Sequence, residues 1–230
     1  MTFSYLQSAV ANHVAVSHTF SAQNLGAADS ERRIIVAVTF GAVLNGAGRS
    51  FSSISVGGVA ATIKVQELLV AQGQSTAIAV AAVPSGTSGD VVVTLTSAPD
   101  TYGRWGLALY RLAGAPLSEA TDTGGGPAPA VSVDLNVPAN GMAVAVLCVP
   151  EQGATSITWT DDIAGEPTED YDETTVPDAR HSGAQRALTS ADTAYTMTAT
   201  RTDSSGSMSI SGYTFAVAEV ATGGSFFLAF

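Results

Sequence analysis

The chain is short of cysteine and of positive charge. Its 230 residues contain one cysteine, Cys148, and one lysine, Lys64. One cysteine excludes an intrachain disulfide, and its place inside the apolar run 142–149 predicts a small buried side chain. Nine Lys and Arg residues stand against 20 Asp and Glu, a formal net charge of -11. A chain so poor in cations is repelled by phosphate backbones and anionic membranes, so we expect neither as a partner.

Long apolar runs and targeting signals are also lacking. No stretch approaches the ~20 uninterrupted apolar residues that a membrane-spanning helix needs. The first residues, Met1 to Tyr5, do not combine a basic segment with a following apolar run. We therefore expect no membrane insertion and no export by a signal peptide.

The rest of the composition is typical of β-sheets. Hydrophobic residues make up 46% of the chain and charged residues only 13%, which provides a core and an unusually uncharged surface. Ala and Val supply much of the apolar total and are spaced among Thr, Ser and Gly, a composition typical of pleated strands and tight turns. The predicted fold class is all-β, an antiparallel two-sheet β-sandwich of jelly-roll-like type.

The two halves of the chain follow the same strand plan. The segment 53–56 (SISV) aligns with 156–159 (SITW), and the later matches keep the register after one extra residue. The matched pairs are Asp90 with Asp192, Thr94 with Thr196, Thr96 with Thr198, Asp100 with Asp203, Gly103 with Gly206 and Tyr110 with Tyr213. Self-similarity over half a chain indicates a fold built from two related halves, which is a property of the scaffold.

Strands and turns can be placed along both halves. The predicted strands are 33–40, 54–56, 59–65, 76–83, 90–96 and 105–112 in the first half, and 131–137, 142–149, 192–201 and 207–220 in the second. Gly57-Gly58 supplies the positive φ angles of a tight hairpin, and Asn140-Gly141 gives a second turn signal.

The same pattern predicts how the chain is divided. We expect a single sandwich domain over residues 1–230, with pseudo-repeats at about 17–113 and 131–221. The Gly- and Pro-containing segment 114–130 is interpreted as a connector, and 1–16 and 222–230 as terminal arms. Two small β-sandwich domains divided at 114–130 are the alternative.

Seven carboxylates in thirteen residues form the one dense charged cluster. It consists of Asp161, Asp162, Glu166, Glu169, Asp170, Asp172 and Glu173. Oxygen ligands on a loop are what Ca²⁺ accepts, which makes Asp161, Asp162, Glu169, Asp170 and Asp172 the candidate metal ligands. The spacing is not that of a calcium-binding loop, however, and Pro167 and Pro177 favour a solvated excursion. We expect no obligatory cofactor.

Trp159 immediately precedes this acidic stretch. An exposed tryptophan beside carboxylates would be a platform for a carbohydrate ring, whereas a buried one fills a sandwich core. His13, His18 and His181 lack the spacing of a metal motif, and a strand would place His13 and His18 on opposite faces. No serine has the Gly-x-Ser-x-Gly frame of a hydrolase. We expect no catalytic residues and no enzymatic activity.

The segment from Gly223 onward is strongly aromatic. After a Gly-Gly pair it contains Phe226, Phe227, Leu228 and Phe230. Such a segment is expected to pack in a groove, either of its own fold or of a neighbouring subunit, so these four residues are the predicted interface residues.

Part of the chain resembles a β-sandwich module of tailed-phage virion proteins and bacterial surface proteins. The resemblance rests on 54–62 (ISVGGVAAT), 76–84 (TAIAVAAVP) and, most closely, 86–94 (GTSGDVVVT). From about Ser30 onward, the chain is similar to small virion proteins of tailed phages and of gene-transfer particles of alphaproteobacteria. The resemblance carries over no catalytic residues. It implies a structural role in a particle, as a head decoration, a spike, or a tail or fibre component.

Two functions are therefore expected to compete. The first is a non-enzymatic virion component, assembled in a bacterial cytoplasm, whose partners are other virion subunits and further copies of itself. The second is a carbohydrate- or receptor-binding module that uses Trp159 and the acidic residues with Ca²⁺, directed at a host-surface sugar.

Overall fold

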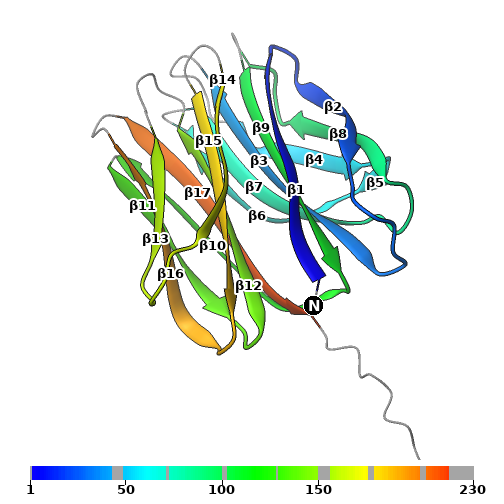
Figure 1. The fold of residues 1–230 in the computed structure, drawn as a ribbon. Helices are drawn as coiled ribbons and strands as arrows, with labels where there is room; N and C mark the ends of the chain where they lie inside the picture. The colour runs from blue at the N-terminus through cyan, green and yellow to red at the C-terminus, as the bar shows by residue number, and fades with distance from the viewer. Residues whose placement is uncertain are drawn as a thin grey trace, which may run out of the picture.

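The structure, a computed structural model, describes residues 2–42, 49–70, 73–99, 103–127, 129–149, 156–175, 179–202 and 206–217. Nearly all of these residues lie in antiparallel strands, which confirms the predicted all-β fold (Figure 1). No described helix has the length and hydrophobicity that a membrane span requires.

The first half contains two sheets that face each other. The five-stranded sheet has the order β1-β9-β3-β7-β6 and the four-stranded sheet the order β2-β8-β4-β5. Its strands are β1 (Thr2–His13), β2 (Ser17–Asn24), β3 (Arg32–Ala42), β4 (Phe51–Val56), β5 (Val59–Ala60), β6 (Thr62–Leu69), β7 (Gln74–Ala82), β8 (Ser88–Leu95) and β9 (Gly103–Ala113).

The second half repeats this plan. Its five-stranded sheet has the order β10-β17-β12-β15-β14 and its three-stranded sheet the order β11-β16-β13. The strands are β10 (Pro116–Pro127), β11 (Ala130–Val137), β12 (Gly141–Val149), β13 (Ile157–Asp161), β14 (Thr168–Thr175), β15 (Ala179–Leu188), β16 (Asp192–Arg201) and β17 (Ser207–Val217). Each strand of one half thus has a counterpart in the other, β5 excepted.

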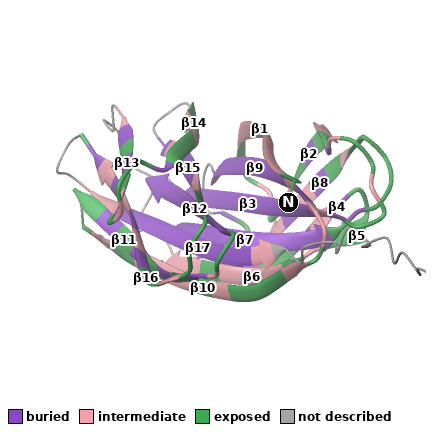
Figure 2. Ribbon diagram, turned by 60° about the horizontal axis from the view of Figure 1, so that its bottom comes forward, coloured by how far each residue is buried: buried purple, intermediate pink, exposed green. Residues whose placement is uncertain are grey.

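The two five-stranded sheets pack on each other and form a seam between the halves. β1 lies against β14 and β6 against β10, while β3 and β12 meet at the centre. Because β1 corresponds to β10 and β6 to β14, these contacts are exchanged by a pseudo-twofold axis. Figure 2 shows the consequence, with the most completely buried strands in the interior of the stack.

Three apolar cores hold this stack together. Ile34, Val36 and Val38 belong to the core of the first half, and their counterparts in β12 belong to the core of the second. Alternate residues of the same strands, such as Ile35 and Val144, fill the seam core. β3 and β12 are therefore buried on both faces, which explains why their sequences are continuous rather than alternating apolar runs.

Most predicted strands and both turns are confirmed. The strand predicted at 192–201 matches β16, and most of the others agree with their elements to within a few residues. The strand predicted at 59–65 is wrong as one element, because it is divided into β5 and β6, which belong to different sheets. Gly57 and Gly58 have φ angles of 56° and 80°, and Val56 pairs with Val59 across them. Asn140 also has a positive φ of 54° in its turn.

Several predictions about organisation need correction. The described residues form four sheets, two in each half, so a two-sheet sandwich describes each half and not the whole chain. Residues 2–13, predicted as an arm, form β1, which pairs with β9 along its whole length. The arm was inferred because the segment precedes the repeated plan, yet Phe3 and Tyr5 face the seam while Leu6 and Ala9 pack on the first core. The single domain over residues 1–230, with two small domains divided at 114–130 as the alternative, stays a prediction.

The predicted connector is also a strand. Residues 116–127 form β10, which pairs with β17 at the edge of the sheet. Its glycines reflect close packing, since a Cβ at Gly125 would lie 2.7 Å from the side chain of Leu69. A Cβ at Gly124 would likewise collide with the backbone oxygen of Ser132. The glycine run therefore admits neighbouring chain segments instead of making a flexible linker.

Candidate functional site: the seam between the halves

The seam between the halves contains several buried polar groups. Two buried tyrosines mark its symmetry, since Tyr110 on β9 and Tyr213 on β17 are pseudo-equivalent and fully buried. Each reaches a carboxylate, which belongs to the other half for Tyr110 and to the same half for Tyr213. Tyr110 faces Asp170 on β14, and Tyr213 donates a hydrogen bond to Glu119 on β10. The tyrosines paired by the sequence repeat are thus equivalent in the fold as well.

The two carboxylates differ in their surroundings. Burial raises the pKa of Asp170 to about 6, an effect that the neighbouring Gln185 and Tyr110 only partly offset. The Gln185 amide donates to Asp170 Oδ1 at 2.7 Å. Desolvation is the largest cause of this shift, and the negative charge of Glu169 adds to it. Asp170 thus holds a proton at a pH where an exposed aspartate does not.

Glu119 has the opposite balance. Its burial disfavours the charged form, but hydrogen bonds from Lys64 and Tyr213 outweigh this and lower the pKa of Glu119. Lys64 Nζ lies 2.8 Å from Glu119 Oε1, and these charges belong to β6 and β10. This partly exposed ion pair therefore links an edge strand of the first half to an edge strand of the second.

A second polar group lies toward the opposite ends of the seam strands. Thr76 and Ser211 share a hydrogen bond of 2.7 Å across the seam, and the Thr39 hydroxyl contacts Nδ1 of His181. Gly106 fits beside this contact, where a Cβ would lie 2.6 Å from Cγ of His181. The close approach explains the glycine in an otherwise bulky strand.

Cys148 and His181 are neighbours in this group but do not form a reactive pair. They are opposite each other in the β12–β15 register, and both are fully buried. Burial raises the pKa of the Cys148 thiol to about 12. Burial, with a smaller contribution from the charge of Arg104, lowers the pKa of His181 to about 3. A neutral thiol beside a neutral imidazole is not the thiolate–imidazolium pair of a nucleophilic cysteine.

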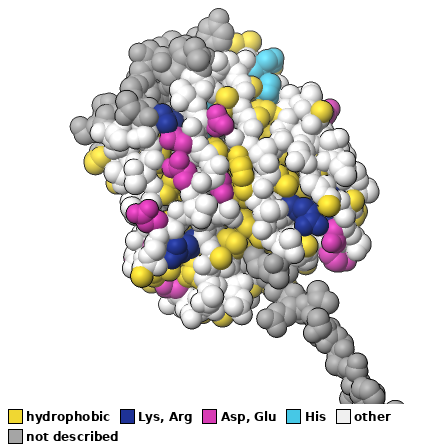
Figure 3. Space-filling model, in the orientation of Figure 1, with side chains coloured by type: hydrophobic (Ala, Val, Ile, Leu, Met, Phe, Trp, Pro, Cys, Tyr) yellow, Lys and Arg dark blue, Asp and Glu magenta, His cyan; other side chains and the backbone are white. Residues whose placement is uncertain are grey.

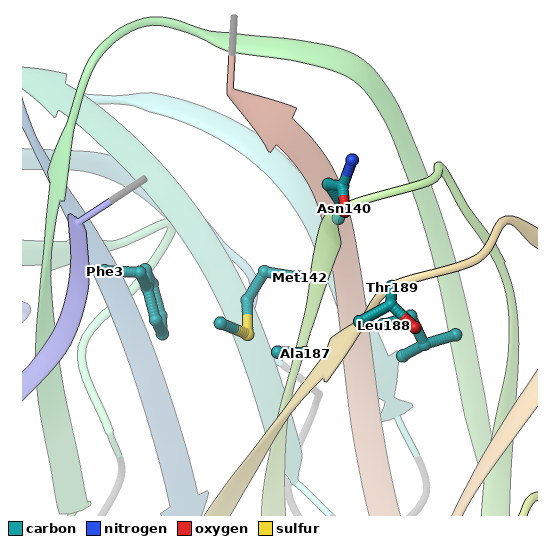
Figure 4. A pocket seen from close by; sticks show the side chains of 7 residues that line it. Phe3, Asn140, Met142, Ala187, Leu188 and Thr189 are labelled. Atoms are coloured by element: carbon teal, nitrogen blue, oxygen red, sulfur yellow. The ribbon is translucent and has the colours of Figure 1, made fainter. Parts of the chain in front are cut away.

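Two pockets open where the seam reaches the surface. One has a volume of about 280 Å³ and lies between Phe3 on β1 and the ends of β12 and β15 (Figure 4). Its lining residues are Phe3, Asn140, Gly141, Met142, Ala187, Leu188 and Thr189. We call it the apolar seam pocket, because side chains such as Phe3, Met142 and Leu188 dominate its wall.

The second pocket is the pseudo-symmetric counterpart of the first. It has a volume of about 340 Å³ and is bounded by β3, β6, β7 and the start of β10, with Arg33, Lys64 and Glu119 in its wall. Arg33 corresponds to Met142, and Ala82 to Ala187, by the strand registers. We call it the charged seam pocket. The same backbone geometry thus makes one apolar and one charged cavity.

The predicted metal ligands do not converge. Asp161 accepts a hydrogen bond from the Tyr195 hydroxyl at 2.9 Å, and Asp162 one from the backbone N–H of Thr196 at 3.0 Å. Asp172 forms a two-point ion pair with Arg180, at 2.5 and 2.6 Å. Glu169 is exposed, and Asp170 turns into the seam.

The acidic segment is accordingly not one solvated loop. Residues 168–175 form β14, the edge strand that pairs with β15. Alternation along a strand sends neighbouring carboxylates to different faces, where separate partners satisfy them. Among the described residues, no three His, Cys, Asp or Glu side chains are placed to hold a metal ion.

The predicted carbohydrate platform is not at the surface. Trp159 is only 3% exposed, and its Nε1 donates to Ser182 Oγ at 2.8 Å inside the second half. The side chain fills the core between β13 and β15, so it cannot stack on a sugar ring from solvent. This corrects the platform hypothesis and agrees with the expectation that a strand tryptophan in a sandwich is buried.

The histidine and tail predictions have different outcomes. His13 and His18 were expected on opposite faces of a strand, yet their ring centroids are 5.4 Å apart because the chain turns between β1 and β2. The predicted interface residues Phe226, Phe227, Leu228 and Phe230 lie outside the described residues.

Comparisons with known proteins add no family to this description. No protein-family model matches the chain, and no curated protein matches it. The site must therefore be interpreted from its own geometry.

Sequence reasoning missed the polar seam. Asp170 was seen only as one member of an acidic cluster, and Glu119 was placed in a connector. The available signal was the pairing of Tyr110 with Tyr213 in the repeat, because a buried tyrosine hydroxyl needs a polar partner. For Tyr110, which carboxylate supplies this partner depends on how the halves stack, which the repeat alone does not specify.

Proposed function

We propose that the protein is a non-enzymatic structural component of a phage or phage-like particle, acting through contacts with other subunits and with further copies of itself. The resemblance of its strand and turn sequences to virion sandwich modules suggests the particle. The observation that carries the proposal is the character of the two outer sheets, whose outer faces are rich in hydroxyl groups and carry little charge.

The outer face of the three-stranded sheet is a regular array of hydroxyls. Thr158 pairs with Thr200, and Thr160 with Thr198, across β13 and β16. Ser132 on β11 extends the second row, with its Oγ 2.9 Å from Thr198 Oγ1. These side chains are exposed or half-buried. Among the residues of this face, Asp134 adds a negative charge and is hydrogen-bonded to Thr196.

The outer face of the four-stranded sheet has a similar composition. Ser17, Thr19, Ser53, Ser55, Val92 and Thr94 alternate with the residues of the first core. Figure 3 shows the molecule in the orientation of Figure 1. On this face too, charged side chains are few and form small separate groups. Depletion of charge is characteristic of the central part of protein interfaces, since desolvating a charge is costly. Such faces suit extended contact with a neighbouring subunit.

A carbohydrate-binding module is the weaker reading of the same surface. Hydroxyl arrays can bind sugars through hydrogen bonds, but burial of Trp159 removes the aromatic group on which that hypothesis depended. The large hydrophobic side chains that the described surface exposes are aliphatic: Val14, Val16, Val59, Val70 and Leu117. No specific observation favours this second function.

Arginine substitutions on the outer faces test the proposal. Thr198→Arg and Val92→Arg each place a cation at the centre of one face, where burial against a neighbour would leave it unpaired. We expect at least one of them to weaken self-association about tenfold or more, measured as the dissociation constant by analytical ultracentrifugation. Thr198→Ser keeps the hydroxyl and is the matched control. Unchanged association in both arginine variants would contradict the proposal.

A further inference from the structure

The charged seam pocket contains a cation that no carboxylate of the described part of the chain neutralises. All nine Lys and Arg residues are among the described ones. Four of them are buried: Arg32, Arg49, Arg104 and Arg201. Four form ion pairs with carboxylates: Lys64, Arg111, Arg180 and Arg186. Arg33 is the remaining cation, half-buried in the wall of the pocket and in no ion pair with a described carboxylate.

The hydrogen bonds of Arg33 leave one edge of its guanidinium for a ligand. Nη1 donates to the backbone carbonyl groups of Glu31 at 3.1 Å and Arg32 at 3.2 Å. The N–H groups of Nε and Nη2 have no partner among the residues that the structure describes. These two nitrogens form a fork that can hold both oxygens of one carboxylate. The bonds from Nη1 orient the fork in advance, which lowers the entropy cost of binding.

The charges in the pocket wall favour a ligand with a single negative charge. Two cations, Arg33 and Lys64, and one carboxylate, Glu119, give the wall a net charge of +1. Lys64 Nζ lies 2.8 Å from Oε1 and 2.9 Å from Oε2 of Glu119, so these two charges offset each other. The charge of Arg33 is left over. A phosphate with two negative charges would find too few cations here and would be repelled by Glu119.

The rest of the wall is mainly aliphatic. Its residues are Val59, Ala60, Thr62, Val80, Ala82 and Pro116. Val59 is 37% exposed, so a ligand that covers it removes apolar surface from water. The volume of about 340 Å³ is at the lower end of the ~300–1,000 Å³ range of ligand pockets. The pocket therefore suits a small molecule, or one side chain, with a short aliphatic body.

The pseudo-symmetric pocket shows what Arg33 contributes. The apolar seam pocket has the same strand arrangement, with Met142 at the position of Arg33, and none of its described lining residues is charged. A carboxylate would lose its hydration there without gaining a charged partner. Charge, rather than the shape of the backbone, should therefore decide which of the two pockets takes an anion.

We propose that the charged seam pocket binds a monocarboxylate with a short aliphatic body. Nε and Nη2 of Arg33 hold the carboxylate, and Val59 and Val80 contact the aliphatic part. The carboxylate belongs either to a free acid or to an acidic side chain of a second copy of the chain, since both present the same chemistry. The inference does not depend on assembly into a particle.

Butyrate is the probe, and methyl resonances report where it binds. We expect a titration to shift the methyl signals of Val59 and Val80 in proton–carbon correlation spectra, with a dissociation constant of about 1 mM for a ligand of this size. The methyl signals of Met142 and Leu188, in the apolar seam pocket, should not move. Arg33→Met should weaken binding about tenfold or more, because it removes the fork and the charge. Arg33→Lys, which keeps only the charge, should weaken binding about threefold.

Two controls separate this result from nonspecific effects. Unchanged signals of Met142 and Leu188 in the Arg33→Met spectrum show that the variant is folded. Uncharged 1-butanol should bind the wild type and Arg33→Met equally, since it has no carboxylate. The proposal is overturned if a large excess of butyrate leaves Val59 and Val80 unshifted. It is also overturned if butyrate binds Arg33→Met, or 1-butanol binds the wild type, as tightly as butyrate binds the wild type.

Sedimentation with and without excess butyrate distinguishes the two sources of the carboxylate. Self-association that is weakened both by butyrate and by Arg33→Met assigns the pocket to an acidic side chain of a second copy. Self-association that neither changes, or a protein that is monomeric throughout, assigns it to a free acid. The butyrate titration itself does not require self-association, so its failure is distinct from a failure of the proposed structural role.

Discussion

Replacing Arg32 with methionine is expected to lower the free energy of unfolding by about 3–5 kcal/mol. Arg32 is fully buried at the start of β3. Its guanidinium donates to five backbone carbonyl groups at 2.6–3.1 Å, which belong to Leu25, Gly26, Val83, Ser85 and Gly86.

These bonds fix two turns against each other, one before β3 and one between β7 and β8. Methionine keeps much of the length of the side chain but removes every donor, so buried carbonyl groups lose their partners. Unsatisfied groups carry a desolvation cost that exceeds the net gain of an ordinary hydrogen bond. Urea unfolding curves, with the denaturant slope compared between variants, measure the loss.

The adjacent arginine is the matched control for this prediction. Arg33 is half-buried and donates to the carbonyl groups of Glu31 and Arg32 near the surface. Arg33→Met should cost less than about 1 kcal/mol, as for most partly exposed polar side chains. A loss for Arg32→Met as small as that for Arg33→Met would show that the five carbonyl groups find other partners, and would contradict the account.

The second large effect is an opposed pair of pH dependences in the seam. His181 has a folded pKa of about 3 against an ordinary value of 6.5. Unfolding therefore takes up a proton below pH 6.5, and the contribution of His181 to stability is lost as the pH falls. Asp170 has a folded pKa of about 6 against 3.8. Its folded form binds the proton first, so its contribution to stability rises as the pH falls through 6.

Between pH 7 and 4.5 the two contributions have similar size and opposite sign. Each corresponds to about 2–3 kcal/mol at ~1.4 kcal/mol per pKa unit, with the value for the partly exposed Asp170 at the lower end. His181→Gln should make the protein gain stability on acidification relative to the wild type. Asp170→Asn should make it lose stability over the same range.

The change between the two pH values is the readout, because it is independent of packing lost in either variant. Urea unfolding at pH 7.0 and 4.5 provides it for the wild type and both variants. Tyr5, Tyr110, Tyr171, Glu169 and Gln185 surround Asp170 and are retained in all three proteins. Parallel pH responses in the three proteins would show that neither group has the surroundings described here.

The strands that the sequence predicts well are those with a strong local pattern. β3 and β12 appear as continuous apolar runs, and β16 alternates, so their positions follow from burial on two faces or one. The turns at Gly57-Gly58 and Asn140-Gly141 were also predictable, since positive φ angles restrict the residue type. Local rules suffice wherever the backbone conformation alone selects the residues.

Among the strands that the sequence predicts poorly are two edges of the seam sheets. β10 contains proline and three consecutive glycines, and β14 is mostly acidic and threonine. Proline, glycine, aspartate and glutamate disfavour strands in isolation. They are tolerated here because an edge strand pairs on one side only, and because Gly124 and Gly125 admit close neighbours. Tertiary contacts therefore override propensity at these positions.

The candidate site depends on the same long-range contacts. Nothing in the local sequence of Asp170 or Glu119 indicates that each meets a buried tyrosine, Asp170 one of the other half and Glu119 one of its own. The seam pockets arise from how two sheets stack, so their lining residues come from strands far apart in the chain. The aromatic character of 226–230, by contrast, was evident from composition, but these residues lie outside the described part of the chain, so their role as interface residues stays a prediction.

The most direct test of the proposed role is the mass of the purified wild-type protein in solution, measured by light scattering over a range of concentrations, with and without calcium. A structural subunit that acts through its uncharged outer faces is predicted to form an oligomer of defined size that calcium does not change. A protein that remains monomeric at every concentration, or that associates only when calcium is added, would contradict this account.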